Sequence, residues 1–211
     1  MKNYIITIAR TYGSGGKTVG KMLADELGIK YYDREILRLA SDESGISEAL
    51  FGAADEKVSS ASLSSLFRIS KKTVLGEPLP PDSDDFSSNE NLFNYQSKII
   101  KSIADEESCV IIGRCADYVL KDYKNAIRIF CYAPEEACIK RDMDLNGHSR
   151  KESAKLIAEK DKNRGDYYKY YTGKQWDSAT NYDMCINTAS LDYEEILTIV
   201  KSFVDVVNSR D

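Results

Sequence analysis

Residues 12–21, YGSGGKTVGK, place a lysine and a threonine directly after closely spaced glycines. Such glycines allow backbone amides to surround an oxyanion, because glycine adopts angles that side chains forbid and lets phosphate approach the main chain. Lys17 would then reach the β- and γ-phosphates of a nucleotide, and the Thr18 hydroxyl would bind Mg²⁺. The pattern predicts a site for ATP and Mg²⁺ formed by Gly13, Ser14, Gly15, Gly16, Lys17 and Thr18.

One position departs from the phosphate-loop pattern. Thr11 stands where the pattern has its first glycine, so this residue would have to tolerate a tight turn. An ordinary glycine turn with Lys17 exposed to solvent is the structural alternative. The neighbouring residues favour the phosphate loop, because an apolar stretch typical of a buried strand precedes it at 3–9 and a helical pattern follows at 18–27. The positive end of that helix dipole would point at the same ligand.

The rest of the chain continues this alternation of strands and helices. Ser149 and Glu152 have the spacing of a capping box, which opens a long helix toward Gly165. Alternating strands and helices are typical of an α/β fold with a parallel sheet. Further strands are predicted at 29–33, 108–113, 126–132 and 182–188, and further helices at 34–41, at 91–106 and from about Asp192.

Length and composition predict a single globular domain over residues 1–211. Acidic residues outnumber basic ones by 34 to 29, which argues against nucleic-acid binding but allows a small anionic ligand. No apolar run is long enough for a membrane span or a signal peptide. The five cysteines lack a CxxC spacing, so we expect reduced, mostly buried thiols in a cytoplasmic protein. With His148 alone, a multi-histidine metal site or a histidine-based triad is not expected.

The stretch from about 59 to 90 differs from the rest of the chain. It is rich in serine, holds three of the four prolines and has little periodicity. We interpret it as a mobile connection or a small lid over the fold, within an inserted helical region at 44–96.

Several stretches together resemble the cytidylate kinase-like family of P-loop nucleoside-monophosphate kinases. They are YGSGGKT (12–18), YYDREIL (31–37), VIIGRCADYVL (110–120), DKNRGDYYKYYTGKQW (161–176) and NYDMCINT (181–188). The resemblance covers nearly the whole chain and is weakest at about 55–90. It implies a P-loop kinase fold: a five-stranded parallel sheet flanked by helices on both faces, with an acceptor site beside the second and third strands and a lid-like helical region at 141–176. It also implies transfer of the γ-phosphoryl group of ATP to a phosphorylated or hydroxyl-bearing acceptor, whose identity fold analogy does not give.

Asp33, Arg114 and Asp117 are the predicted acceptor-binding residues. Asp33 ends a predicted strand at the edge where open α/β sheets bind ligands, and it also fits an N-cap of the helix that follows. Arg114 matches the arginine of the family's Gly-Arg pair, which grips the acceptor phosphate, whereas a surface arginine is the alternative. The family's typical DGRD motif has aspartates where this chain has Ile112 and Cys115. Asp117 lies close enough in sequence to substitute for these aspartates. Alternatively, its negative charge merely interacts favourably with the dipole of the helix that it begins.

Arg141, Lys160, Lys162 and Arg164 are the predicted lid cations. Arg141 and Arg164 match the family's lid arginines best, and with Lys17 and Arg114 they are the predicted catalytic residues. Lys160 and Arg164 lie four residues apart, so they would share one helical face and reach the same polyphosphate. Cations at these positions would stabilise the negative charge that the transition state spreads over three equatorial oxygens. A solvated, salt-bridged helix end is the alternative interpretation of this charged segment.

The predicted function is ATP- and Mg²⁺-dependent phosphoryl transfer to a small acceptor, with a nucleoside monophosphate such as CMP or dCMP as the first candidate. A nucleotide- or phosphate-binding protein with little transfer activity and a kinase for a non-nucleotide acceptor are the alternatives. The predicted partner is a small-molecule nucleotide, and binding to nucleic acid or to a membrane is not expected. The sequence does not decide whether the protein forms a homo-oligomer. A cluster of aromatic residues is expected to pack the lid helix against the body of the protein or to form a subunit contact. A platform for a base or sugar is the alternative. The cluster consists of Tyr167, Tyr168, Tyr170, Tyr171 and Trp176.

Overall fold

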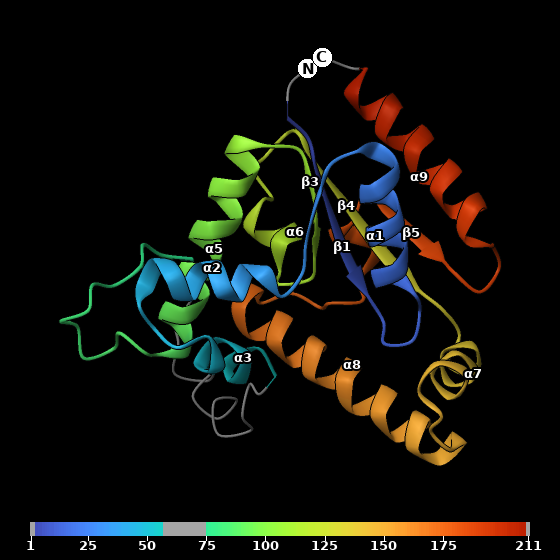
Figure 1. Ribbon diagram of the computed structural model, residues 1–211, viewed down its shortest axis with the longest axis horizontal. Coiled ribbons are helices and arrows are strands. Elements are labelled where there is room, and N and C mark those ends of the chain that lie inside the picture. Colours follow the sequence, from blue (N-terminus) through green and yellow to red (C-terminus); the bar gives the residue numbers. More distant parts are fainter. Residues whose placement is uncertain (1–2, 57–74, 210–211) are drawn as a thin grey trace.

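The computed structural model describes residues 3–56 and 75–209. It contains a sheet in the order β2-β3-β1-β4-β5, in which each neighbouring pair of strands is parallel (Figure 1). The predicted α/β class with a five-stranded parallel sheet is confirmed. The strands are β1 (Ile5–Arg10), β2 (Lys30–Tyr32), β3 (Cys109–Ile112), β4 (Ala126–Tyr132) and β5 (Met184–Asn187).

Helices connect these strands and cover the sheet. In the described part of the chain, no helix is both long enough and apolar enough to cross a bilayer. The helices are α1 (Gly16–Leu27), α2 (Glu35–Ser44), α3 (Glu48–Glu56), α5 (Asn89–Glu106), α6 (Ala116–Val119), α7 (Glu135–Asn146), α8 (Arg150–Thr172) and α9 (Tyr193–Asn208), with a 3-10 turn at Ala179–Asn181.

The alternating side chains of β1 contribute to two cores, one on each face of the sheet. Ile6 and Ile8 pack in a cluster with residues of α1 and α9. Ile5 packs in the opposite cluster with residues of α5, α6 and the C-terminal part of α8, where the rings of Phe93 and Tyr171 stack with their centroids 4.1 Å apart. The four tyrosines of α8 are buried in or beside this cluster, so the prediction that they pack the helix is confirmed. The five cysteines are free, and four of them are buried.

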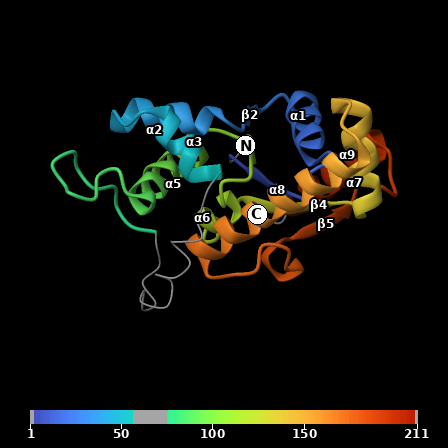
Figure 2. The ribbon, with the colours of Figure 1, turned by 90° about the horizontal axis from the view of Figure 1, so that it is seen from below.

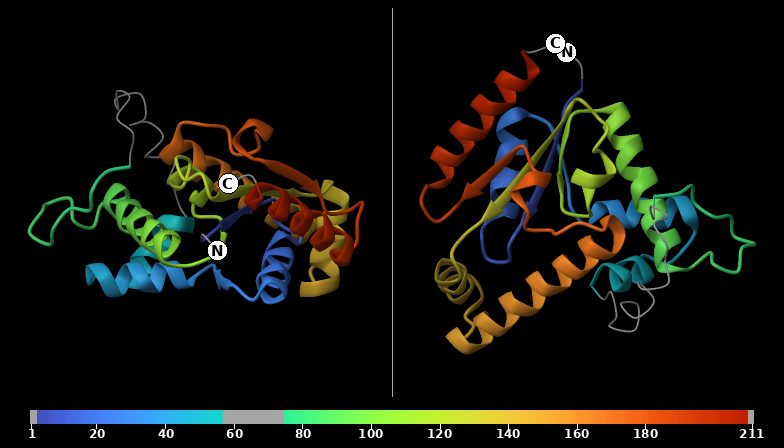
Figure 3. Two further views of the ribbon diagram at one scale, coloured as in Figure 1. Left: turned by 90° about the horizontal axis from the view of Figure 1, so that it is seen from above. Right: turned by 180° about the vertical axis from the view of Figure 1, so that it is seen from behind.

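The order of the strands brings several loops together at the carboxyl edge of the sheet. β1 is the central strand, and its Ile8 carbonyl accepts a hydrogen bond from the amide of Gly113, directly after β3. The loop after β1 therefore lies beside the loop after β3. Helix α8 runs across this edge, as Figures 1 and 2 show, while β1 begins and α9 ends at the opposite side of the molecule (Figure 3).

The start of α2 corrects one prediction. The helix begins at Glu35, and its N-cap is Arg34, which has a helical backbone and makes no side-chain cap bond. Asp33 therefore does not cap the helix, because it lies one residue too early. Its carboxylate pairs with Lys17 instead.

Helix α8 is longer than predicted. The capping box between Ser149 and Glu152 is present, but the helix continues through Gly165 to Thr172 and ends at Gly173, whose φ is +71°. A glycine inside a helix costs about 1 kcal/mol relative to alanine. The buried tyrosines that follow Gly165 offset this cost, so the helix reaches across the whole carboxyl edge.

Of the predicted inserted region 44–96, the structure describes 44–56 and 75–96. Residues 75–88 form turns and extended chain, and α5 holds them through its side chains: Asn91 accepts from the amide of Leu79 at 2.7 Å, and Asn94 accepts from the amide of Gly76 at 3.0 Å. The first half of the predicted mobile segment, 59–74, lies outside the described residues. That 44–96 acts as an insertion and 141–176 as a lid remains a prediction.

Candidate functional site

The glycine-rich loop joins the end of β1 to the start of α1. Gly13 and Gly15 have φ values of +76° and +82°, in the left-handed region that strains any residue with a side chain. Among the described non-glycine residues, only Arg114 and Cys115 have a positive φ. Thr11 therefore adopts an ordinary backbone conformation, and its departure from the glycine of the pattern causes no left-handed strain.

The first turn of α1 is open to a ligand. Within the described chain, the amides of Gly15, Lys17 and Thr18 donate no hydrogen bond to a protein group, and the side chains of Lys17 and Thr18 are exposed. A Cβ on Gly16 would lie 2.7 Å from the Cβ of Arg10, which shows how closely the helix start approaches β1. Unsatisfied amides at a helix N-terminus form an anion site.

Side chains from α7 and the chain after β5 support the outer side of the loop. Arg141 on α7 donates to the carbonyl of Gly13 at 2.6 Å and to the carbonyl of Thr188 at 3.4 Å. The Thr188 hydroxyl in turn donates to the carbonyl of Ser14 at 2.5 Å. Arg141 thus contacts the loop through backbone carbonyls and is not among the residues that line the cavity described next.

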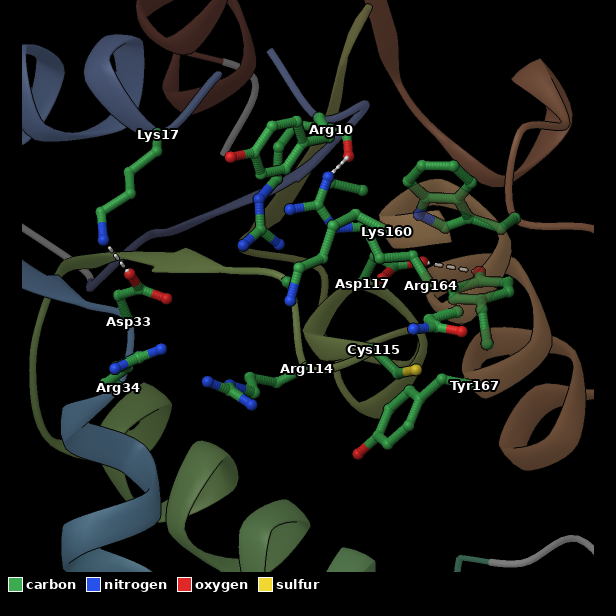
Figure 4. Close-up of a pocket in the computed structure, with 16 residues that line it drawn as sticks. Arg10, Lys17, Asp33, Arg34, Arg114, Cys115, Asp117, Lys160, Arg164 and Tyr167 are labelled. Atoms are coloured by element: carbon green, nitrogen blue, oxygen red, sulfur yellow. Dashed lines mark hydrogen bonds and ion pairs between the residues drawn. The ribbon is translucent and has the colours of Figure 1, made fainter. Parts of the chain in front are cut away.

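A cavity of about 330 Å³ opens at the carboxyl edge between the phosphate loop, the loop after β3 and α8. Figure 4 shows that charged side chains from these elements turn toward a common space. Positive charge dominates its wall although the whole chain has a net charge of −5, and such a local excess favours an anionic ligand. The cationic lining residues are Arg10, Lys17, Arg34, Arg114, Lys160 and Arg164, and the carboxylates are Asp33 and Asp117.

Lys17 and Asp33 meet at one side of this cavity. Their charged atoms are 2.7 Å apart, and the lysine side chain is 65% exposed while that of the aspartate is 14% exposed. An exposed ion pair of this kind contributes at most about 1 kcal/mol to stability. Breaking this ion pair would therefore cost little, which leaves the ammonium group available to another anion.

A strained turn follows β3 at the floor of the cavity. Gly113, Arg114 and Cys115 have φ values of +68°, +60° and +52°, so three successive residues are left-handed. For each non-glycine residue this conformation costs about 1–3 kcal/mol, and such strain concentrates at functional sites. The turn aims Arg114 into the cavity (Figure 4).

Asp117 lies at the start of α6 and is only 5% exposed. Burial raises the pKa of its carboxyl group, while hydrogen bonds from Tyr168 and from the amides of Asp117 and Tyr118 act in the opposite direction. The Tyr168 hydroxyl donates to it at 2.6 Å, which joins α6 to α8. The carboxylate lines the cavity and at the same time fixes the position of the tyrosine-bearing part of α8.

Helix α8 binds the end of β1 and the loop after it through Arg164 and through Asp161, which the sequence did not single out. Asp161 accepts a hydrogen bond from the amide of Tyr12 at 2.7 Å and another from Arg164 at 3.1 Å. Arg164 also donates to the carbonyl of Arg10 at 3.1 Å. In the sequence, Asp161 lies within a run of charged residues and looks like an ordinary solvated helix residue. Only its hydrogen bond with Tyr12, which is 149 positions away in the sequence, distinguishes it.

The predicted lid cations lie in different places. Lys160 and Arg164 line the cavity, as their spacing of four residues predicted. Lys162 is not among the lining residues and pairs with Asp166 on the same helix. Arg141 supports the outer side of the loop. Arg10 and Arg34 also line the cavity and were not predicted; Arg10 could have been noticed as the charged residue that ends an otherwise buried strand.

A buried carboxylate ties the connection between α7 and α8 to the phosphate loop. Asp142 is 2% exposed and accepts hydrogen bonds from His148 at 2.9 Å, from Asn146 at 2.7 Å and from the hydroxyl of Tyr12 at 3.4 Å. Burial alone would raise the pKa of Asp142, but the hydrogen bonds from His148 and Asn146 help to hold it below its ordinary value of 3.8.

We expect Asp142→Asn to lower the free energy of unfolding at pH 7 by about 1–3 kcal/mol, because buried donors lose a charged acceptor. Since the folded-state pKa of Asp142 is depressed, its contribution is complete above the unfolded-state pKa and is lost as pH falls through the folded-state value. The stability gap between wild type and variant, measured by urea unfolding, should therefore close in acid below about pH 3.9. A gap that stays constant with pH would contradict this assignment.

Comparison with known proteins supports the P-loop kinase fold. The family described as the cytidylate kinase-like family matches residues 5–190. A cytidylate kinase of Methanosarcina barkeri is 26% identical over 202 residues, which cover 95% of this chain and 96% of the relative. A cytidylate kinase of Pyrococcus horikoshii is 27% identical over 203 residues, which cover 95% of this chain and 88% of the relative.

Solved structures share the architecture. An uncharacterized protein from Eubacterium ventriosum superposes with a TM-score of 0.69 at 25% identity, covering 96% of this chain and 99% of the other. A shikimate kinase from Bacteroides thetaiotaomicron superposes with a TM-score of 0.53 at 13% identity, covering 96% and 98%. At that identity the likeness concerns the fold alone, a P-loop kinase fold with this strand order.

Proposed function

The chain belongs to the cytidylate kinase-like family, and on this basis we propose that it transfers the γ-phosphoryl group of ATP to a nucleoside monophosphate, with CMP and dCMP as the first candidates. The observation that carries the proposal is the cavity with six cationic side chains that adjoins the open amides of the phosphate loop. A donor polyphosphate and a phosphorylated acceptor both need such positive charge.

The donor side is supported by the loop itself. The amides of Gly15, Lys17 and Thr18 would surround the phosphates, and the Lys17 ammonium group would move from Asp33 to the β- and γ-phosphate oxygens. Little covalent chemistry is asked of these residues. Their contribution is to orient the phosphoryl group and to neutralise the charge that develops on it.

Mg²⁺ fits the oxygen-bearing residues at this point. It prefers oxygen ligands and usually keeps water and substrate phosphates among them. The exposed Thr18 hydroxyl and the Asp33 carboxylate, directly or through water, supply oxygens beside the loop. In the described chain no cluster of three histidine, cysteine or carboxylate side chains forms a separate metal site. When bound, the ion would neutralise part of the negative charge of the phosphates.

The acceptor side is supported by Arg114 and its neighbours. The planar guanidinium group can hold two phosphate oxygens at once, and the strained turn at 113–115 directs it into the cavity. Arg34, Lys160 and Arg164 surround the same space. A neutral polyol would leave this much charge unmatched, so a phosphorylated acceptor is favoured.

A binding protein with little transfer activity is the second candidate. It is favoured by Ile112 and Cys115, which are both buried and occupy the positions of the family's aspartates. If Asp33 and Asp117 do not replace those carboxylates, the loop would hold a nucleotide without organising Mg²⁺ for transfer.

We expect a panel of acceptors, tested with ATP and Mg²⁺, to separate these functions. ATP should raise the thermal midpoint, since a ligand at 100 times its Kd stabilises the native state by about 2.7 kcal/mol. CMP or dCMP should then yield the diphosphate and ADP. Stabilisation by ATP without product from any acceptor would establish the binding protein, and product from an unphosphorylated hydroxyl acceptor alone would establish a different kinase. If ATP does not stabilise the protein and no acceptor yields product, the proposed function is refuted.

A further inference from the structure

Arg10 occupies a slot that two distant glycines leave open. A Cβ on Gly16, at the start of α1, would lie 2.7 Å from the Cβ of Arg10. A Cβ on Gly113, after β3, would lie 2.2 Å from Nη1 of the same arginine. Contacts below 3.0 Å force something to move. Any other residue at Gly113 would displace the guanidinium group, and any other residue at Gly16 would force β1 and the start of α1 apart. The stem of Arg10 therefore passes beside the phosphate loop, and its guanidinium group rests on the turn that carries Arg114.

The slot places the charge of Arg10 between the donor and acceptor sides of the cavity. Lys17 belongs to the phosphate loop and Arg114 to the acceptor side, and Figure 4 shows the side chain of Arg10 entering the same space as both. The Arg10 side chain is only partly exposed, and its backbone carbonyl accepts a hydrogen bond from Arg164 on α8. A cation held there by packing needs little reorganisation when charge develops beside it.

We propose that Arg10 is a catalytic residue, whose guanidinium group binds the phosphoryl group as it passes from donor to acceptor. This inference rests on the proposed function. In the transfer, a lone pair on an acceptor oxygen forms the new bond to the γ-phosphorus of ATP. The bond from that phosphorus to the β–γ bridging oxygen breaks and leaves its electron pair on ADP. Arg10 gives up no proton and donates hydrogen bonds to the equatorial oxygens of the phosphoryl group.

The test compares Arg10→Met with Arg10→Lys and with a matched surface control, Arg38→Met. Methionine keeps an apolar stem in the slot, and lysine keeps the charge but loses the planar fork. Arg38 is a half-exposed arginine on α2 whose ion pairs with Glu35 and Asp42 lie outside the cavity. With ATP and CMP, Arg10→Met should lower kcat by about 10²–10³-fold, the loss typical of removing one transition-state donor. Arg10→Lys should recover part of this loss, and Arg38→Met should leave kcat unchanged.

A binding measurement keeps the inference testable whatever the acceptor is. ADP and Mg²⁺ with aluminium fluoride imitate the phosphoryl group in transfer, and such analogues bind much more tightly than the ground state. By calorimetry, wild type should bind this complex more tightly than ADP with Mg²⁺ alone, and Arg10→Met should lose that difference while it keeps its ADP affinity and its thermal midpoint.

Each outcome bears on a separate claim. If Arg10→Met binds the fluoroaluminate complex as wild type does, Arg10 is not catalytic, although the proposed function stands. The inference also fails if wild type binds ADP without any preference for the complex. If wild type binds neither ligand, the proposed function fails and the inference fails with it. A low thermal midpoint for Arg10→Met, together with full activity of Arg10→Lys, would reduce Arg10 to a packing residue.

Discussion

Lys17→Ala is expected to lower kcat for phosphoryl transfer by about 10²–10³-fold, with little change in stability. The ammonium group belongs to the first turn of α1, where the open amides of the loop lie, and it lines the cavity. Its removal takes away charge stabilisation that grows in the transition state. Its side chain is 65% exposed and its ion pair with Asp33 contributes at most about 1 kcal/mol. Steady-state kinetics and thermal unfolding of the variant measure the two effects separately.

Lys21→Ala is the matched control for this variant. Lys21 is an exposed lysine on the same helix, α1, and is not among the cavity-lining residues. Its replacement should change neither kcat nor the thermal midpoint. Turnover that survives Lys17→Ala at the wild-type rate would show that the lysine has no part in transfer, and an equal loss in both variants would indicate a general effect on α1.

Gly113→Ala is expected to have a large effect on activity and a moderate one on stability. Alanine at a φ of +68° costs about 1–2 kcal/mol, and its Cβ would meet the Nη1 atom of Arg10. Because that atom is the far end of a flexible side chain, the guanidinium group moves and the fold survives. A displacement of about 1 Å in a positioned group can cost about 10²-fold in rate, so kcat should fall by about this factor.

Gly28→Ala separates backbone strain from the displacement of Arg10. Gly28 ends α1 with a φ of +65°, nearly that of Gly113, but a Cβ there would meet nothing within 4 Å. The two variants should therefore lose similar amounts of unfolding free energy in urea, while Gly113→Ala alone loses activity. Equal kcat values for the two variants would mean that the position of Arg10 does not matter to the reaction.

The fold could be predicted from the sequence because its signals are local. Short apolar runs such as 108–113 predict buried strands, and the structure places β3 at Cys109–Ile112. The phosphate loop is equally local, since strand, glycines and helix follow one another. The end of α8 was missed for the opposite reason: burial of its tyrosines against α5 and α6 outweighs the helix-weakening effect of Gly165, and that burial is a tertiary effect.

The site could be predicted only where a motif marks it. Arg114 follows a glycine at the end of a strand and was found, whereas Arg10 has no motif. Its importance depends on Gly16 and Gly113, which are 97 positions apart in sequence and meet only in the folded protein. The spacing of Arg141 along the chain likewise could not show that α7 turns this side chain toward the Gly13 carbonyl and away from the cavity.

The ion pair between Lys17 and Asp33 bears on the order in which two substrates would bind. While the pair persists, the carboxylate is neutralised by its partner and offers little to an incoming hydroxyl or amino group. On the proposed function, arrival of ATP would draw the ammonium group away and leave the aspartate able to accept hydrogen bonds from another ligand. Donor entry would thereby complete the pocket for the second substrate, and a kinase of this kind would take its substrates in a fixed order.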